Sequence, residues 1–184
     1  PSFRSTLEDV FGVRYIAIGV PIDKVDPRAK PEDFPLIART KDAYVYENPR
    51  ALPRVMLVGG WRQADFKAMA KTGWPDVDPK QTVLLETPPR SAVSGGGTAK
   101  LASYRNTEVI VETDASVSSL LLLNDVWHPW WQACIDSNPI EILKANVLFR
   151  AVEVPAGKHS VRFSFHPFAG LRSWLGLGVS APRC

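Results

Sequence analysis

The second half of the chain holds six short strand-like runs, which recur about every nine to twelve residues. They are Glu108–Thr113, Ser119–Asn124, Trp131–Asp136, Ile140–Lys144, Leu148–Val154 and Ser160–His166. Short strands at such regular spacing are typical of an all-β sandwich or barrel. The last run is the clearest, because Val161, Phe163 and Phe165 alternate with polar residues and so line one face. Residues 120–123 are apolar throughout, which predicts a central strand.

These runs predict a mainly β protein, with an antiparallel β-sandwich over residues 100–168 of the jelly-roll or galactose-binding-like kind. We expect one or more earlier strands to complete the sandwich. Candidates are Gly12–Ile18, Leu36–Arg39, Ala43–Glu47, Arg54–Val58 and Thr82–Glu86. Residues 91–99 are rich in Gly and Ser, which predicts a flexible loop.

One helix is predicted, over residues 62–72. Phe66, Met69 and Ala70 recur at helical spacing, and Gly73 provides a stop. Residues 1–90 are therefore expected to form a smaller α+β portion that packs on the sandwich.

Composition excludes several classes of function. The chain is 45% hydrophobic and 22% charged, as in folded proteins, and its 22 Lys and Arg are scattered rather than gathered in a stripe, so no nucleic-acid partner is expected. It has no apolar stretch long enough to span a membrane. Neither a nucleophile elbow nor a phosphate-binding loop is present, since the Gly-rich run at 95–97 has no Lys-Ser or Lys-Thr after it, and no cofactor is expected.

The two cysteines, Cys134 and Cys184, lack the spacing of a metal site, and we expect no bound metal. Cys134 lies in an apolar run, which favours a small buried thiol. A disulfide between the two cysteines stays open.

Several motifs occur together in a fixed order. They are FGVRY (11–15), VYENPRALPR (45–54), DP before VLLE (78–86), NDVWHPWWQACID (124–136), AN (145–146), LFR (148–150) and VPAGKH (154–159). In this order they resemble the C-terminal extracytoplasmic region of the YfhO-type bacterial multispanning membrane proteins. This sequence departs from the family pattern in three places: Asn124 stands where Ser is usual, Trp127 and His128 replace tyrosines, and Trp130 replaces a glycine.

The resemblance implies a parent protein similar to lipid-linked-sugar glycosyltransferases, whose catalytic acid lies in a membrane part outside this sequence. It implies an extracytoplasmic domain, tethered to the membrane, with the membrane-embedded remainder of the parent as partner. Residues 169–184 are then expected to be a membrane-proximal tail, in which Trp174 suits an interfacial position. The alternative is a frayed apolar chain end that packs on the domain.

The run from Asn124 to Trp131 carries the candidate functional residues. Asp125, Trp127, His128 and Trp130 form a candidate glycan-binding group, because aromatic rings stack on sugars while carboxylate and imidazole bond hydroxyls. The structural alternative has Asp125 capping the turn and Trp131 filling the core.

Asn146 and Arg150 form a second candidate group, interpreted as a structural polar cluster. Arg150 lies in an apolar strand, so if it is buried it needs a partner, for which Glu153, Asp125 and Asp136 are candidates. His159 is expected to be an exposed turn residue.

Three functions follow from these residues. The first is a non-catalytic accessory domain that assists glycan handling or packs on the membrane domain, with cell-envelope glycan as a partner. The second is an autonomous carbohydrate-binding module that uses the Trp127–Trp131 loop. The third is a hydrolase that uses Asp125 and His128.

Overall fold

The computed structural model describes residues 2–167 and 184, and this part of the chain holds three helices and fourteen strands. The protein is mainly β, as the sequence predicted. It divides into two compact units, Pro1–Pro53 and Arg54–Cys184. Among the described residues, no helix is long and apolar enough to cross a membrane.

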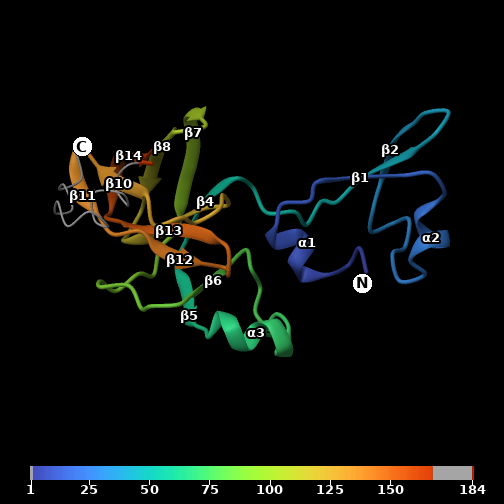
Figure 1. Cartoon of the computed structure of the whole chain (residues 1–184), viewed down its shortest axis with the longest axis horizontal. Helices are drawn as coiled ribbons and strands as arrows, with labels where there is room; N and C mark the ends of the chain where they lie inside the picture. The colour runs from blue at the N-terminus through green and yellow to red at the C-terminus, as the bar shows by residue number, and fades with distance from the viewer. Residues whose placement is uncertain (1, 168–183) are drawn as a thin grey trace. The chain divides into compact units, whose positions relative to one another are not determined.

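The first unit is a three-stranded antiparallel sheet with two short helices (Figure 1). Its elements are α1 (Thr6–Val10), β1 (Tyr15–Ile18), α2 (Ile22–Val25), β2 (Leu36–Arg39) and β3 (Tyr44–Glu47), with β3 between β1 and β2. Ile16, Ile22, Phe34 and Tyr46 are buried in its core. Asp9 accepts hydrogen bonds from Asn48 at 2.8 Å and from Arg50 at 3.1 Å, and so ties α1 to the segment after β3.

The second unit contains two larger sheets. Its elements are β4 (Val55–Val58), β5 (Gly60–Gln63), α3 (Phe66–Thr72), β6 (Thr82–Leu85), β7 (Gly97–Arg105), β8 (Glu108–Ala115), β9 (Ser119–Leu123), β10 (Trp131–Ile135), β11 (Asn138–Ile140), β12 (Leu143–Ala145), β13 (Phe149–Val154) and β14 (Gly157–Phe165). The five-stranded sheet has the order β11-β10-β14-β8-β7, and the six-stranded sheet β4-β9-β13-β12-β6-β5. All pairs are antiparallel except β5 with β6.

One apolar core lies between these sheets, as a β-sandwich requires. Fully buried side chains from both sheets form a single cluster: Val111, Val161 and Phe163 from one, and Leu121, Leu123 and Val152 from the other. The alternation predicted for the last strand is confirmed at Val161 and Phe163. The central position predicted for residues 120–123 is also confirmed, because β9 is buried throughout and lies between β4 and β13. The jelly-roll topology stays a prediction.

The boundary between the units differs from the one predicted at residue 90. It lies between Pro53 and Arg54, because β4, β5 and β6 are strands of the six-stranded sheet. Val55–Val58 pairs with Leu120–Leu123, so a segment from the first half of the chain completes the sandwich, as expected.

The predicted flexible loop over residues 91–99 is in part an ordered strand. β7 begins at Gly97, and the preceding backbone is held by hydrogen bonds from Ser94 to Ser118 and from Ser116 to Gly96. Gly95 is packed so closely that an added Cβ would meet the side chain of Ser119 and the carbonyl oxygen of Ser118. The glycines there permit close packing of backbone on backbone.

The predicted helix over residues 62–72 is confirmed in its second part. α3 spans Phe66–Thr72, whereas residues 62 and 63 belong to β5. Asp65 sets the start, because its side chain accepts hydrogen bonds from the backbone N–H groups of Lys67 and Ala68. Gly73, with a φ of 78°, ends the helix.

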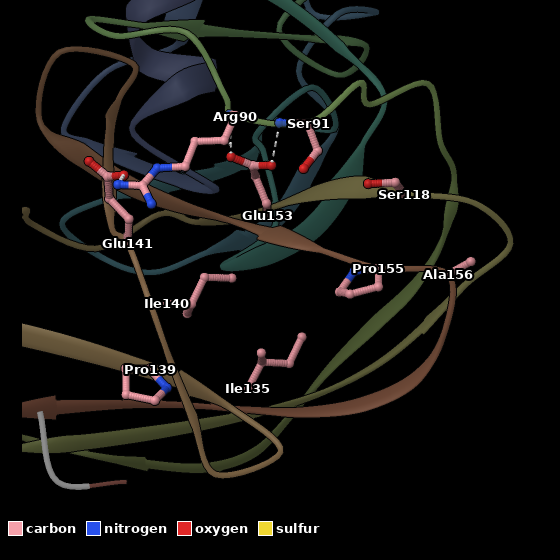
Figure 2. Close-up of a pocket in the computed structure, with 10 residues that line it drawn as sticks. All are labelled: Arg90, Ser91, Ser118, Ile135, Pro139, Ile140, Glu141, Glu153, Pro155 and Ala156. Carbon is pink, nitrogen blue, oxygen red and sulfur yellow. Dashed lines mark hydrogen bonds and ion pairs between the residues drawn. The ribbon is translucent and has the colours of Figure 1, made fainter.

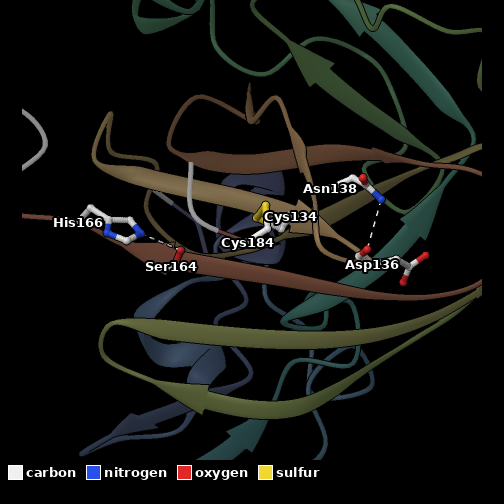
Figure 3. The surroundings of a disulfide bond; sticks show 6 residues. All are labelled: Cys134, Asp136, Asn138, Ser164, His166 and Cys184. Carbon is white, nitrogen blue, oxygen red and sulfur yellow. Dashed lines mark hydrogen bonds between the residues drawn. A yellow bond between two sulfur atoms is a disulfide. The ribbon is translucent and has the colours of Figure 1, made fainter. Parts of the chain in front are cut away.

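Cys134 and Cys184 form a disulfide (Figure 3). The expectation of a buried free thiol at Cys134 was wrong, although the residue is only 2% exposed. Within β10 it follows Ala133, which packs in the core, so its side chain is on the other face of the five-stranded sheet. The predicted membrane-proximal tail, residues 169–184, lies outside the described residues except for Cys184.

Candidate functional site

The loop between β9 and β10 is fixed to the sandwich by a buried ion pair. Asp125 is the second residue of the loop, and its Oδ2 accepts a hydrogen bond from Nη2 of Arg150 at 2.8 Å. Arg150 lies on β13 with its side chain fully buried, whereas the Asp125 side chain is 24% exposed. Asp125 also accepts a bond from the Tyr104 hydroxyl at 3.3 Å and one from the Val126 backbone at 2.9 Å. Of the three partners considered for Arg150, the structure selects Asp125.

Two aromatic rings enclose the Arg150 guanidinium. Its central carbon lies 3.7 Å from the Trp131 ring centroid and 5.5 Å from that of Phe163. Nε and Nη1 have no hydrogen-bond partner among the described residues. The positive charge of the guanidinium is instead stabilised by cation–π contact with the two ring faces. Burial lowers the pKa of Arg150 to about 10, against the opposing effect of the Asp125 carboxylate. Arg150 therefore remains a cation at neutral pH, and its ion pair with Asp125 holds the loop in place.

Trp127 lies at the middle of the loop beside a surface cleft of about 370 Å³. We call this the Trp127 cleft; it is lined by Phe66, Lys67, Glu86, Trp127, Lys144, Val147 and Leu148. The ammonium of Lys144 lies 5.7 Å from the Trp127 ring centroid and 5.6 Å from that of Phe66. The Trp127 backbone N–H donates to the Leu148 carbonyl at 2.7 Å, which fixes the ring's position against the β12–β13 turn.

His128 and Trp130 point to a different neighbourhood. Their rings meet edge to face at 4.8 Å between centroids, and each lies near Phe165, at 5.6 Å and 6.0 Å. Trp131 also lies 5.2 Å from Phe165. The loop tryptophans are half-buried and have different neighbours, so they do not form one continuous shelf.

The structure does not bring Asp125 and His128 together. In the described part of the chain no hydrogen bond joins their side chains: Asp125 bonds Arg150, while Nδ1 of His128 accepts from the Trp130 backbone at 3.3 Å. The pair that an acid–base hydrolase would need is therefore not formed in this geometry.

Asn146 and Arg150 are both structural, but they act in separate places. Fully buried Asn146 pairs with Leu84 of β6: its Oδ1 accepts from the Leu84 N–H at 2.9 Å, and its own N–H donates to the Leu84 carbonyl at 2.8 Å. Asn146 and Val147 both have positive φ, of 47° and 73°. For a β-branched residue such as Val147 this is a strained conformation, which costs about 1–3 kcal/mol. The Asn146 bonds hold the strained turn at the wall of the Trp127 cleft.

His159 is not the simple exposed turn residue that was expected. Its Nδ1 lies 2.5 Å from Oδ2 of Asp136, and its side chain is only 18% exposed. The hydrogen bond to Asp136 raises the pKa of His159, and the same bond lowers the pKa of Asp136. The pair links the turn after β10 to the beginning of β14.

A second cleft, of about 450 Å³, was not predicted (Figure 2). We call it the Glu153 cleft; Ile135, Pro139, Ile140 and Pro155 give it an apolar wall, while Arg90, Glu141 and Glu153 line the opposite side. Glu153 accepts bonds from the backbone N–H groups of Arg90 at 2.6 Å and Ser91 at 2.9 Å. The Arg90 guanidinium pairs with Glu141 at 2.6 Å. These residues come from distant segments, so no local spacing in the sequence signals them.

Among residues 2–167 and 184, no three His, Cys, Asp or Glu side chains gather as metal ligands would. Comparison with known proteins finds no matching family model, no matching curated protein and no matching solved structure.

Proposed function

We propose that this chain is a non-catalytic, extracytoplasmic accessory domain of a multispanning membrane protein that resembles lipid-linked-sugar glycosyltransferases, and that it holds glycan at the loop between β9 and β10. The ordered motifs of the sequence support the parent class. The Trp127 cleft supports the glycan role and carries the proposal.

The Trp127 cleft has the parts that sugar binding needs. The Trp127 ring offers a flat apolar surface at the cleft, while Lys67, Glu86 and Lys144 supply polar contacts. The loop that carries the ring is fixed at Asp125 by Arg150 and at Trp127 by the Leu148 carbonyl. A binding surface held in place before the ligand arrives loses less entropy on binding.

The disulfide supports the location. Disulfides form and persist in oxidising compartments outside the cytoplasm and are rare within it. Cys134 is almost fully buried, so the bond to Cys184 belongs to the folded structure rather than to an exposed surface thiol.

The geometry supports the accessory domain over the two alternatives. An autonomous carbohydrate-binding module is expected to present its aromatic residues as one platform, whereas Trp127 lies beside Lys144 and Trp130 beside Phe165. A hydrolase would need Asp125 free to act with His128, whereas Asp125 neutralises a buried arginine.

Binding is tested by isothermal titration calorimetry, in which cell-envelope glycans are titrated into the 184-residue chain. We expect a response that Trp127→Ala abolishes and Trp61→Ala leaves unchanged. Trp61 is the matched control, because it is an exposed tryptophan of β5 and does not line the Trp127 cleft. If no envelope glycan binds, or if both variants bind like the wild type, the glycan role is wrong.

The location and the parent are tested separately. Alkylation of intact cells, with and without a reductant, should find both cysteines oxidised. The full-length gene product should contain several membrane-spanning helices. Reduced thiols in intact cells, or a parent without such helices, would contradict the membrane-protein part of the proposal.

A further inference from the structure

We infer that the Trp127 cleft binds anionic sugar residues in preference to neutral ones, and that Lys144 binds their negative charge. This inference rests on the proposed glycan role and names the substrate class of that same site. The observation behind it is the position of the Lys144 ammonium, which lies within 6 Å of two aromatic rings at the cleft.

The first argument is the combination of a ring and a cation on one small surface. Phe66 is 6% exposed and so forms a buried wall, while Trp127 is half-buried and keeps part of its ring accessible. A pyranose that stacks on Trp127 would lie close to the Lys144 ammonium, which is 5.7 Å from the centroid of that ring. A carboxylate on that pyranose would form a charge-assisted hydrogen bond, which is about twice as strong as a neutral one.

The second argument is the charge balance of the cleft. Lys67 and Lys144 are cations and Glu86 is the one carboxylate among the lining residues. The Lys144 ammonium lies 3.7 Å from Glu86 Oε2, and both side chains are partly exposed, at 31% and 46%. An exposed pair of this kind is weak, so a ligand carboxylate can take the place of Glu86 at Lys144. A neutral sugar gains nothing from that exchange.

The third argument is that Lys144 cannot readily move away. It lies on β12 between β13 and β6, opposite Arg150 in the register. Its ammonium lies over the faces of both rings, and the cation–π attraction holds it there. The cation is therefore placed at the cleft before a ligand binds.

The test compares two ligands that differ only in charge. Tri-galacturonate and its methyl ester share one backbone, and the ester has lost the three carboxylates. We expect the acid to bind the wild-type chain about fivefold more tightly or better, and this preference to fall as salt rises. Backbone amide shifts in NMR spectra should map the acid to Phe66, Lys67, Trp127 and Lys144.

Three variants make the test specific. Lys144→Gln should remove most of the preference, so that the acid and the ester bind with similar affinity. Glu86→Gln should strengthen acid binding by about threefold, because it removes the competing carboxylate. Lys158→Gln is the matched control: Lys158 is an exposed strand lysine, 3.9 Å from Asp114 and distant in the sheets from the Trp127 cleft, and its loss should change nothing.

The outcomes separate this inference from the proposed function. Equal binding of acid and ester, or a preference that survives Lys144→Gln, would overturn the inference and leave the glycan role standing. If neither ligand binds but other envelope glycans do, the inference also fails. If no glycan of any charge binds, the proposed function itself fails.

Discussion

A single arginine decides where the candidate loop lies. Arg150 is fully buried, and the only carboxylate bonded to it in the described structure is that of Asp125, the second residue of the loop. A buried charge needs a partner, so any arrangement of the loop that moves Asp125 away leaves the guanidinium uncompensated. The ion pair thus fixes the start of the loop, and with it the position of Trp127.

Loss of Asp125 should lower the free energy of unfolding by more than loss of Arg150 does. Asp125→Ala leaves an unpaired cation in the core and should lower the free energy of unfolding by about 3–5 kcal/mol. Arg150→Met replaces the cation by an apolar side chain of similar length, and the partly exposed Asp125 then turns to water, so the loss should be about 1 kcal/mol. Urea denaturation of both variants measures the difference. Equal losses would mean that Arg150 contributes by packing and not through its charge.

Two adjacent glycines give a matched test of close packing. A Cβ at Gly95 would lie 2.8 Å from the Ser118 carbonyl oxygen and 2.9 Å from that of Val117, whereas a Cβ at Gly96 would meet nothing within 4 Å. Gly95→Ala should therefore destabilise the protein by about 1–3 kcal/mol, because the backbone must move. Gly96→Ala should be neutral or stabilising by a few tenths of a kcal/mol to about 1 kcal/mol. Thermal unfolding compares the two, and similar melting temperatures would contradict the packing described for this segment.

At the scale of elements, the sequence predicts best those strands that are either buried on both faces or buried on one face and exposed on the other. β9 is apolar in sequence and buried throughout, and β14 alternates because one of its faces lines the core. β7 was missed because it is the edge strand of its sheet and most of its residues are exposed. Its sequence therefore lacks the apolar pattern that predicts a strand. The helices α1 and α2 have five and four residues, which is too short for a helical period to show.

Of the residues that line the Trp127 cleft, the sequence singled out only Trp127 as a candidate for glycan binding. The run from Asp125 to Trp131 was recognised, and Asp125 was among the partners considered for Arg150. The partners of Trp127 could not be found, because Phe66 and Lys144 reach it only through the pairing of β6 with β12. Sequence spacing carries no information on contacts that long-range strand pairing creates.

The link between the turn after β10 and the beginning of β14 should make stability depend on pH. The hydrogen bond between His159 and Asp136 raises the pKa of the histidine and lowers that of the aspartate. The ion pair is therefore complete between the ordinary pKa values of 3.8 and 6.5, and it is lost as pH rises through the raised pKa of His159 or falls through the lowered pKa of Asp136.

His159→Gln tests this link. The wild type should have the higher melting temperature at about pH 5.5, and the difference should shrink by about pH 9, where the imidazole is neutral. Calorimetry at both pH values measures it. A difference that is constant across this range would show that the ionised pair contributes nothing.

For the whole molecule, the largest single constraint is the disulfide. It joins residues 50 apart in the sequence, and closing a loop of that length restricts the unfolded chain. Cys184→Ser should lower the free energy of unfolding by about 4 kcal/mol. Denaturation of this variant, and of the wild type with a reductant, should agree. A loss below about 1 kcal/mol in both would mean that the bond is incidental to the fold.

In the six-stranded sheet, strands that are far apart in the sequence pair with each other, and this has a consequence for biosynthesis. A ribosome adds about 5–20 residues per second, so Val55–Val58 leaves the exit tunnel seconds before its partner Leu120–Leu123 is made. β13 and β14 come last, and each lies in the interior of its sheet, between β9 and β12 and between β10 and β8. The six-stranded sheet is incomplete until β13 has emerged, and the five-stranded sheet until β14 has emerged, so we expect the sandwich to assemble only after translation has passed residue 165.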